Sequence, residues 1–209
     1  MRSVDPGRRG PRIGTLRIVG GVHRGRRLVV PSGEAVRPTS DRAREALFNI
    51  LSHGDFAAEG LSFADRPVLD AFAGTGAFGL EALSRGASAA VFIENGREAL
   101  AALRRNVRAL DEDDRTEIVA GDATRPPRAA FACAVAFLDP PYGSGLAASA
   151  LPALAAAGWL APEALAVVEL AAAEQWTPLS EFAPLDARVY GAARLVFLRY
   201  EPGNRGDRR

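Results

Sequence analysis

The chain has 209 residues, of which 48% are hydrophobic and 24% are charged. This length allows one α/β domain with a sizeable core but not two, and no apolar run reaches the length of a membrane span. A single cysteine excludes an intrachain disulfide, and the N-terminus lacks the apolar segment of a secretory signal. We therefore expect a cytoplasmic protein that does not associate with membranes.

The net charge of +1 conceals an uneven distribution. Residues 1–45 contain 11 arginines and 4 acidic residues, whereas residues 46–209 contain 15 arginines and 21 acidic residues. Binding of a polyanion is therefore expected only of the N-terminal part. Residues 1–14 and 203–209 mix glycine, proline and arginine without apolar periodicity, which predicts flexible tails.

Residues 15–36 are predicted to form a β-hairpin extension. Two β-prone runs, at 16–19 and 27–30, are separated by three glycines. The rest of the folded chain, residues 37–202, is predicted to be the main domain. It opens with a helix, because apolar residues from 43 to 51 follow helical spacing after a proline and a serine suited to the helix start.

From Pro67 onward, predicted strands alternate with predicted helices, which is typical of a parallel sheet covered on both faces. The predicted strands are 68–71, 89–94, 116–119, 134–138 and 166–169. The predicted helices are 78–84, 98–110 and 147–154. An antiparallel pair, 188–190 and 195–200, closes the domain around Gly191. The predicted class is α/β, with a mostly parallel seven-stranded sheet and helices on both faces.

A glycine-rich turn from Asp70 to Gly79 follows the first predicted strand. Gly74 and Gly76 leave room for a ligand to approach the backbone. The spacing alone fits a dinucleotide site as well as a methyl-donor site. However, the Asp70 carboxylate would repel a pyrophosphate at the start of the helix, so it favours S-adenosylmethionine, whose reactive group is a sulfonium.

Acidic residues also lie at the end of the second predicted strand and just after the third. Glu94 can accept hydrogen bonds from both hydroxyls of a ribose, and Asp122 is placed where a side chain could reach an adenine ring. A solvated loop acid is the simpler alternative for each of them. The predicted cofactor-binding residues from these three strand ends are Asp70, Phe72, Gly74, Gly76, Glu94, Asp122 and Ala123.

The segment Asp139-Pro140-Pro141-Tyr142 follows the fourth predicted strand. Two prolines fix an extended backbone whose carbonyls lack neighbouring N–H groups, so the loop offers acceptors. The Asp139 carboxylate and the Pro140 carbonyl can hold the hydrogens of an exocyclic amino group and direct its nitrogen at an activated methyl group. Tyr142 offers a flat face for stacking an extruded base. A plain turn is the alternative, but four strand ends of this kind favour a catalytic cleft.

Four blocks of the chain resemble one known family. They are 17–27, 37–49, 70–82 and 139–142. Over residues 16–200 the chain resembles the bacterial 16S ribosomal RNA guanine-N2 methyltransferases of the RsmD family. The resemblance implies a Rossmann-like fold with a reversed hairpin at the end of the sheet, S-adenosylmethionine as the donor, and a guanine of the small ribosomal subunit as the acceptor.

The resemblance also bears on individual residues. It places Arg37 beside the cofactor and the base, where it binds either RNA phosphate or the methionine carboxylate. Members of this family usually carry a second acidic residue two positions after the one matching Glu94, whereas this chain has Asn95-Gly96. Ribose contact is therefore expected to depend on Glu94 alone.

The hairpin arginines predict the RNA-binding surface, unless they are simply a solvated face. They are Arg17, Arg24, Arg26 and Arg27. His23 is read as a surface residue, and no metal site is expected. The expected partner is 16S rRNA in an assembled or assembling 30S particle, bound by a monomer. The alternatives are amino-group methylation of DNA adenine or protein glutamine, and an NAD-binding oxidoreductase.

Overall fold

The computed structural model describes residues 16–31, 38–53, 56, 60–177 and 179–203, with no side-chain description for 38–43 and 53. Its strands are β1 (Pro67–Ala71), β2 (Ala89–Glu94), β3 (Thr116–Ala120), β4 (Cys133–Leu138), β5 (Leu160–Ala171), β6 (Phe182–Tyr190) and β7 (Ala193–Tyr200). Its helices are α1 (Pro38–His53), α3 (Ala77–Ser84), α4 (Arg97–Ala109), α5 (Leu146–Ala156) and a 3-10 turn, Asp113–Arg115. Within the described residues, no helix is long and apolar enough to cross a bilayer.

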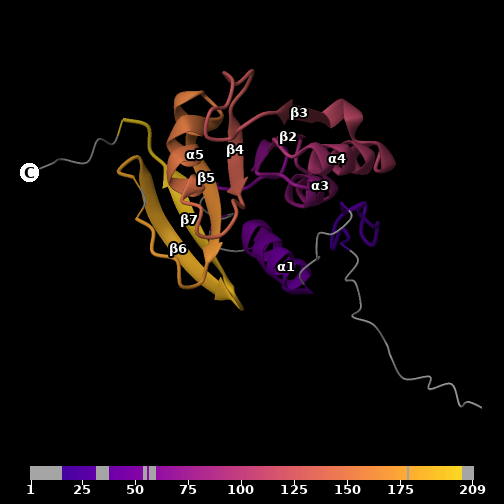
Figure 1. The fold of residues 1–209 in the computed structure, drawn as a ribbon, viewed down its shortest axis with the longest axis horizontal. Coiled ribbons are helices and arrows are strands. Elements are labelled where there is room, and N and C mark those ends of the chain that lie inside the picture. Colours follow the sequence, from indigo (N-terminus) through magenta and orange to yellow (C-terminus); the bar gives the residue numbers. More distant parts are fainter. Residues whose placement is uncertain (1–15, 32–37, 54–55, 57–59, 178, 204–209) are drawn as a thin grey trace, which may run out of the picture.

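The seven strands form one sheet in the order β3-β2-β1-β4-β5-β7-β6 (Figure 1). The strands β1 to β5 pair in parallel, and β7 runs antiparallel to both β5 and β6. This confirms the predicted fold class, including the reversed hairpin at one end of the sheet. It also confirms that the carboxyl ends of β1, β2, β4 and β5 meet at one edge.

Both faces of the sheet are buried, as expected of parallel strands. Along β1, Val68 joins one apolar cluster and Leu69 joins the other, and both are fully buried. Helices α1 and α3 contribute to the first cluster, with Leu103 and Val107 of α4, while α5 contributes to the second. Figure 1 shows α5 on the opposite side of the sheet from α3 and α4.

The strand β5 begins at Leu160, six residues before the predicted start. The sequence signal fails there because Pro162 cannot donate to a strand ladder. The pairing of β5 with β4 accommodates this proline by a register shift. Leu160 lies opposite Cys133, whereas Leu165 lies opposite Val135. A left-handed backbone at Glu163, with φ 62°, lies inside the shifted stretch.

The N-terminal hairpin is reduced to one antiparallel bridge, between Arg17 and Arg27, instead of two full strands. The reason is that part of its backbone bonds to the helices. The amides of Val19 and Gly20 donate to the Glu81 carboxylate of α3 at 2.7 and 2.8 Å. The side chain of Ile18 is fully buried in the first apolar cluster.

Glu81 is the charged centre of this contact and is itself completely buried. Besides the two amides, it pairs with Arg85 at 2.7 Å and with Arg44 of α1 at 3.8 Å. The guanidinium of Arg44 in turn donates to the Arg17 carbonyl at 2.6 Å. One carboxylate therefore joins the hairpin, α1 and α3.

A second link reaches the glycine-rich turn. The Asn106 amide of α4 accepts from the Val29 backbone at 2.7 Å and donates to the Thr75 carbonyl at 2.9 Å. Asn106 is buried, so these bonds satisfy groups that water does not reach. The hairpin and the turn after β1 are thus held by the same side chain.

Replacing Glu81 with glutamine should destabilise the fold strongly, because two guanidinium groups and two amides would lose their shared carboxylate. We expect the free energy of unfolding in urea to fall by about 3 kcal/mol. Glu98→Gln on the exposed face of α4 is the matched control and should change it by less than about 0.5 kcal/mol. Equal stability of the two variants would show that Glu81 does not hold the hairpin.

Candidate functional site

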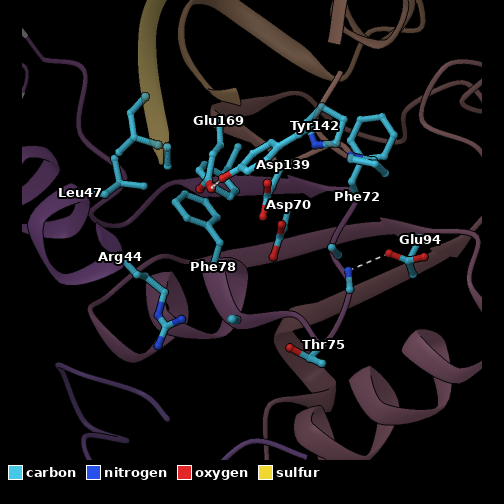
Figure 2. Close-up of a pocket in the computed structure, with 18 of the residues that line it drawn as sticks. Arg44, Leu47, Asp70, Phe72, Thr75, Phe78, Glu94, Asp139, Tyr142 and Glu169 are labelled. Carbon is cyan, nitrogen blue, oxygen red and sulfur yellow. Dashed lines mark hydrogen bonds between the residues drawn. The ribbon is translucent and has the colours of Figure 1, made fainter. Parts of the chain in front are cut away.

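A cavity of 620 Å³ lies where β1, β2, β4 and β5 end. It brings together most of the residues predicted from the strand ends. Those that line it are Asp70, Phe72, Gly74, Glu94, Asp139, Pro140 and Tyr142. Figure 2 shows the carboxylates of Asp70 and Asp139 near each other, with Glu94 to one side and Arg44 to the other.

The glycine-rich turn uses left-handed backbone at three positions, Phe72 (φ 61°), Gly74 (φ 54°) and Gly76 (φ 80°). The side of Gly74 where a Cβ would lie is open, as expected where a ligand approaches the backbone. Gly76 has a different reason to be glycine. A Cβ there would lie 2.4 Å from Leu103, and Gly76 is not among the described residues that line the cavity.

Asp70 lies at the base of the cavity and is only 2% exposed. Its carboxylate accepts a hydrogen bond from the Gly79 amide at 2.9 Å. Burial raises the pKa of Asp70 well above its usual value, and the neighbouring carboxylates of Asp139 and Glu94 raise it further, against the Gly79 bond and Arg44. The cavity therefore holds a carboxyl group that would be stabilised by a cation.

Glu94, at the end of β2, is fixed by backbone amides. One oxygen accepts from Gly74 at 2.7 Å, and the other accepts from Asn95 at 2.9 Å and from Gly96 at 2.6 Å. A Cβ on Gly96 would lie 2.9 Å from that second oxygen, so glycine allows this close approach. Asn95-Gly96 thus positions the carboxylate while leaving it on the cavity wall.

The remaining predicted residues lie elsewhere. Asp122 bonds to the amide and hydroxyl of Thr124, both at 2.8 Å, and Ala123 is buried in the second apolar cluster. Neither is among the described residues that line the cavity. Arg37 lies outside the described residues. The four hairpin arginines are exposed, and the guanidinium of Arg26 also donates to the Ala109 carbonyl at the end of α4.

The Asp139-Pro140-Pro141-Tyr142 loop forms the other end of the cavity. Asp139 follows β4 directly and is exposed, while Tyr142 is half-buried. The Tyr142 hydroxyl donates to the Glu169 carboxylate of β5 at 2.8 Å. The ring orientation is therefore fixed before any ligand binds.

An aromatic stack lies beneath this loop. The Phe78 ring of α3 is stacked between Phe48, at 5.0 Å, and Phe137, at 4.5 Å, measured between ring centroids. Phe78 and Phe137 both line the cavity, which adds an apolar wall to its acidic groups. Such a mixed lining suits a flat, partly polar ligand.

Sequence reasoning missed two charged residues of the cavity wall, Arg44 and Glu169. Glu169 ended a predicted strand, as Glu94 did, so the signal that singled out Glu94 was present for it too. Arg44 carried no such signal, because a helical arginine is usually solvated.

The comparisons with known proteins agree with this geometry. The family model described as "Conserved hypothetical protein 95" matches residues 16–199. Ribosomal RNA small subunit methyltransferase D of Escherichia coli strain K12 is 39% identical over 156 residues, which is 75% of each chain. The protein of the same name from Haemophilus influenzae is 36% identical and covers 80% of this chain and 88% of its own.

The chain belongs to the RsmD family. It is therefore a methyltransferase with a Rossmann-like fold. The solved structure of the Escherichia coli protein yhhF superposes on this RsmD family member with a TM-score of 0.75 and 36% identity, covering 90% of this chain and 99% of that one.

The raised pKa of Asp70 predicts how stability depends on pH. The folded state retains a proton that the unfolded state loses, so stability falls as the pH rises from the usual value of 3.8 through the folded-state pKa. Asp70→Asn removes the titrating carboxyl group, so the variant should not show this fall in stability. Relative to the variant, the wild type should lose up to about 1.4 kcal/mol per pH unit in that range, measured by urea unfolding at several pH values.

Asp122→Asn is the control with the opposite sign. The bonds from Thr124 lower the pKa of Asp122, so the wild type should gain stability over this variant as the pH rises from that lowered pKa to the usual value of 3.8, and not above it. Parallel pH profiles for the wild type and Asp70→Asn would contradict a buried carboxyl group with a raised pKa.

Proposed function

We propose that this chain transfers a methyl group from S-adenosylmethionine to the exocyclic 2-amino group of a guanine in 16S ribosomal RNA. The observation that carries this proposal is that one cavity joins the turn at Asp70 and Gly74 to the loop at Asp139 and Tyr142. Its relatives named small subunit methyltransferase D support ribosomal RNA as the acceptor.

The residues present fit the proposed methyl donor. Four carboxylates, from Asp70, Glu94, Asp139 and Glu169, line the cavity, and they favour a cationic sulfonium over the pyrophosphate of NAD. After its three backbone amides, Glu94 retains one acceptor position, on the oxygen bonded by Gly74, for a ribose hydroxyl. The open side of Gly74 admits the nucleoside. When bound, S-adenosylmethionine supplies a methyl group activated by its positively charged sulfur.

The loop after β4 acts on the acceptor. The Asp139 carboxylate and the Pro140 carbonyl accept the amino hydrogens and direct the nitrogen lone pair, while Tyr142 stacks on the base. The donor would supply its methyl group to this nitrogen and leave as neutral S-adenosylhomocysteine, and the nitrogen would then release a proton to solvent. Asp139 acts mainly by stabilising the positive charge that develops on the nitrogen, since that proton becomes acidic only after transfer.

The exposed hairpin arginines are proposed to bind RNA phosphates. The backbone of this segment is hydrogen-bonded to α3 and α4, so the positions of its arginines are fixed relative to the cavity. These arginines are Arg17, Arg24, Arg26 and Arg27. Arg37 is proposed to bind either RNA phosphate or the methionine carboxylate. The proposed substrate is 16S rRNA in an assembled or assembling 30S particle, methylated by a cytoplasmic monomer.

Asp139→Ala tests the assignment of the acceptor loop. Transfer of tritiated methyl groups to 30S particles that lack the modification should fall by about a thousandfold. Binding of S-adenosylhomocysteine, measured by calorimetry, should stay within about threefold of the wild type, because Asp139 contacts the acceptor. Asp114→Ala, at an exposed position of the 3-10 turn after α4, is the control. Turnover close to wild type in Asp139→Ala would contradict the mechanism.

The double variant Arg24→Gln, Arg27→Gln tests the RNA surface. Removing two phosphate contacts should lower the slope of log affinity against log salt by about 2. Arg188→Gln on β6, whose side chain pairs with Asp186, should leave the slope unchanged. An unaltered slope in the double variant would show that these arginines are only a solvated face.

A further inference from the structure

Glu169 and Asp139 are neighbours at the ends of adjacent parallel strands. Leu138 of β4 lies opposite Val168 of β5, so the next residues in register are Asp139 and Glu169. Parallel strands lie about 4.8 Å apart, and side chains at equivalent register positions share a face. The two carboxylates therefore point to the same side of the sheet, into the same cavity (Figure 2).

The Glu169 carboxylate is held in place but is not saturated. In the described part of the chain, its one hydrogen-bond partner is the Tyr142 hydroxyl, at 2.8 Å on Oε1. A carboxylate can accept about four hydrogen bonds, so Oε2 retains acceptor capacity for a molecule in the cavity. Tyr142 is the residue proposed to stack on the target base. Because Glu169 is bonded to the Tyr142 hydroxyl, its carboxylate would lie beside an edge of that base.

The edge of guanine matches this pair of carboxylates. It presents the N1–H donor beside the two hydrogens of the 2-amino group, whereas adenine presents an acceptor at N1. Resting on the proposed function, we propose that Glu169 accepts the N1–H of the target guanine, while Asp139 and Pro140 hold its amino group. Glu169 is then a specificity-determining residue, because an acceptor at N1 would face the acceptor oxygens of its side chain and be repelled.

A base analogue isolates this contact. 2-Aminopurine keeps the 2-amino group but has an unprotonated N1, which is an acceptor. Placed at the target position of 16S rRNA in reconstituted 30S particles, it should be a poor substrate for the wild type. We expect kcat/KM for guanine to exceed that for 2-aminopurine by about a hundredfold or more.

Glu169→Gln should narrow this preference to below about tenfold. The glutamine oxygen can still accept from Tyr142, so the ring stays in place, while the amide nitrogen can donate to N1 of 2-aminopurine. The variant should therefore lose activity on guanine and gain it on the analogue. A purely structural role for Glu169 would lower both rates together and leave their ratio unchanged.

Glu174→Gln is the matched control. Its carboxylate accepts from the Gly143 amide at 3.1 Å, next to the same loop, but Glu174 is not among the described residues that line the cavity. Its guanine preference should equal that of the wild type. An unchanged preference in Glu169→Gln would overturn the inference alone. If the wild type methylated neither base, the proposed function would fail, and this inference with it.

Discussion

The parallel register of β1, β2, β4 and β5 is the constraint on which the site depends. Parallel strands end at one edge, so residues far apart in the chain, from Asp70 to Glu169, reach one cavity. Burying an ionised carboxylate among others there opposes folding, because burial raises the pKa of Asp70 and the neighbouring carboxylates raise it further. The fold tolerates this cost because burial of both sheet faces stabilises it. The negative charge at the cavity is also complementary to a cationic methyl donor.

A second constraint joins the N-terminal segment to this edge. Glu81 holds the hairpin backbone from inside α3, the helix that begins at the glycine-rich turn. Asn106 bonds both to the hairpin at Val29 and to that turn at Thr75. The segment with the highest positive charge is thus fastened to the elements that would hold the methyl donor. An RNA held by the hairpin would be presented to the cavity at a defined distance.

Much of the fold could be predicted because strands that are buried on both faces are continuous apolar runs, as in β1, β2 and β4. The start of β5 could not, because Pro162 breaks the pattern and only the register shift against β4 accommodates it. Site residues at strand ends were predictable from the sequence, whereas the role of Arg44 depends on how α1 packs. Asp122 lies just after the end of a strand, and Glu94 lies at the end of one, so the two looked alike in the sequence. The Asp122 side chain nevertheless bonds to Thr124 within its own loop, and the sequence spacing gives no indication of that bond.

The central claim is that one cavity unites a methyl donor with the amino group of a guanine. The most direct measurement is to incubate the wild-type protein and labelled S-adenosylmethionine with 30S particles that lack the modification, then digest the 16S rRNA and identify the labelled nucleoside by mass spectrometry. The expected product is N2-methylguanosine at a single position. Label in N6-methyladenosine, or in ribosomal protein instead of RNA, would contradict it.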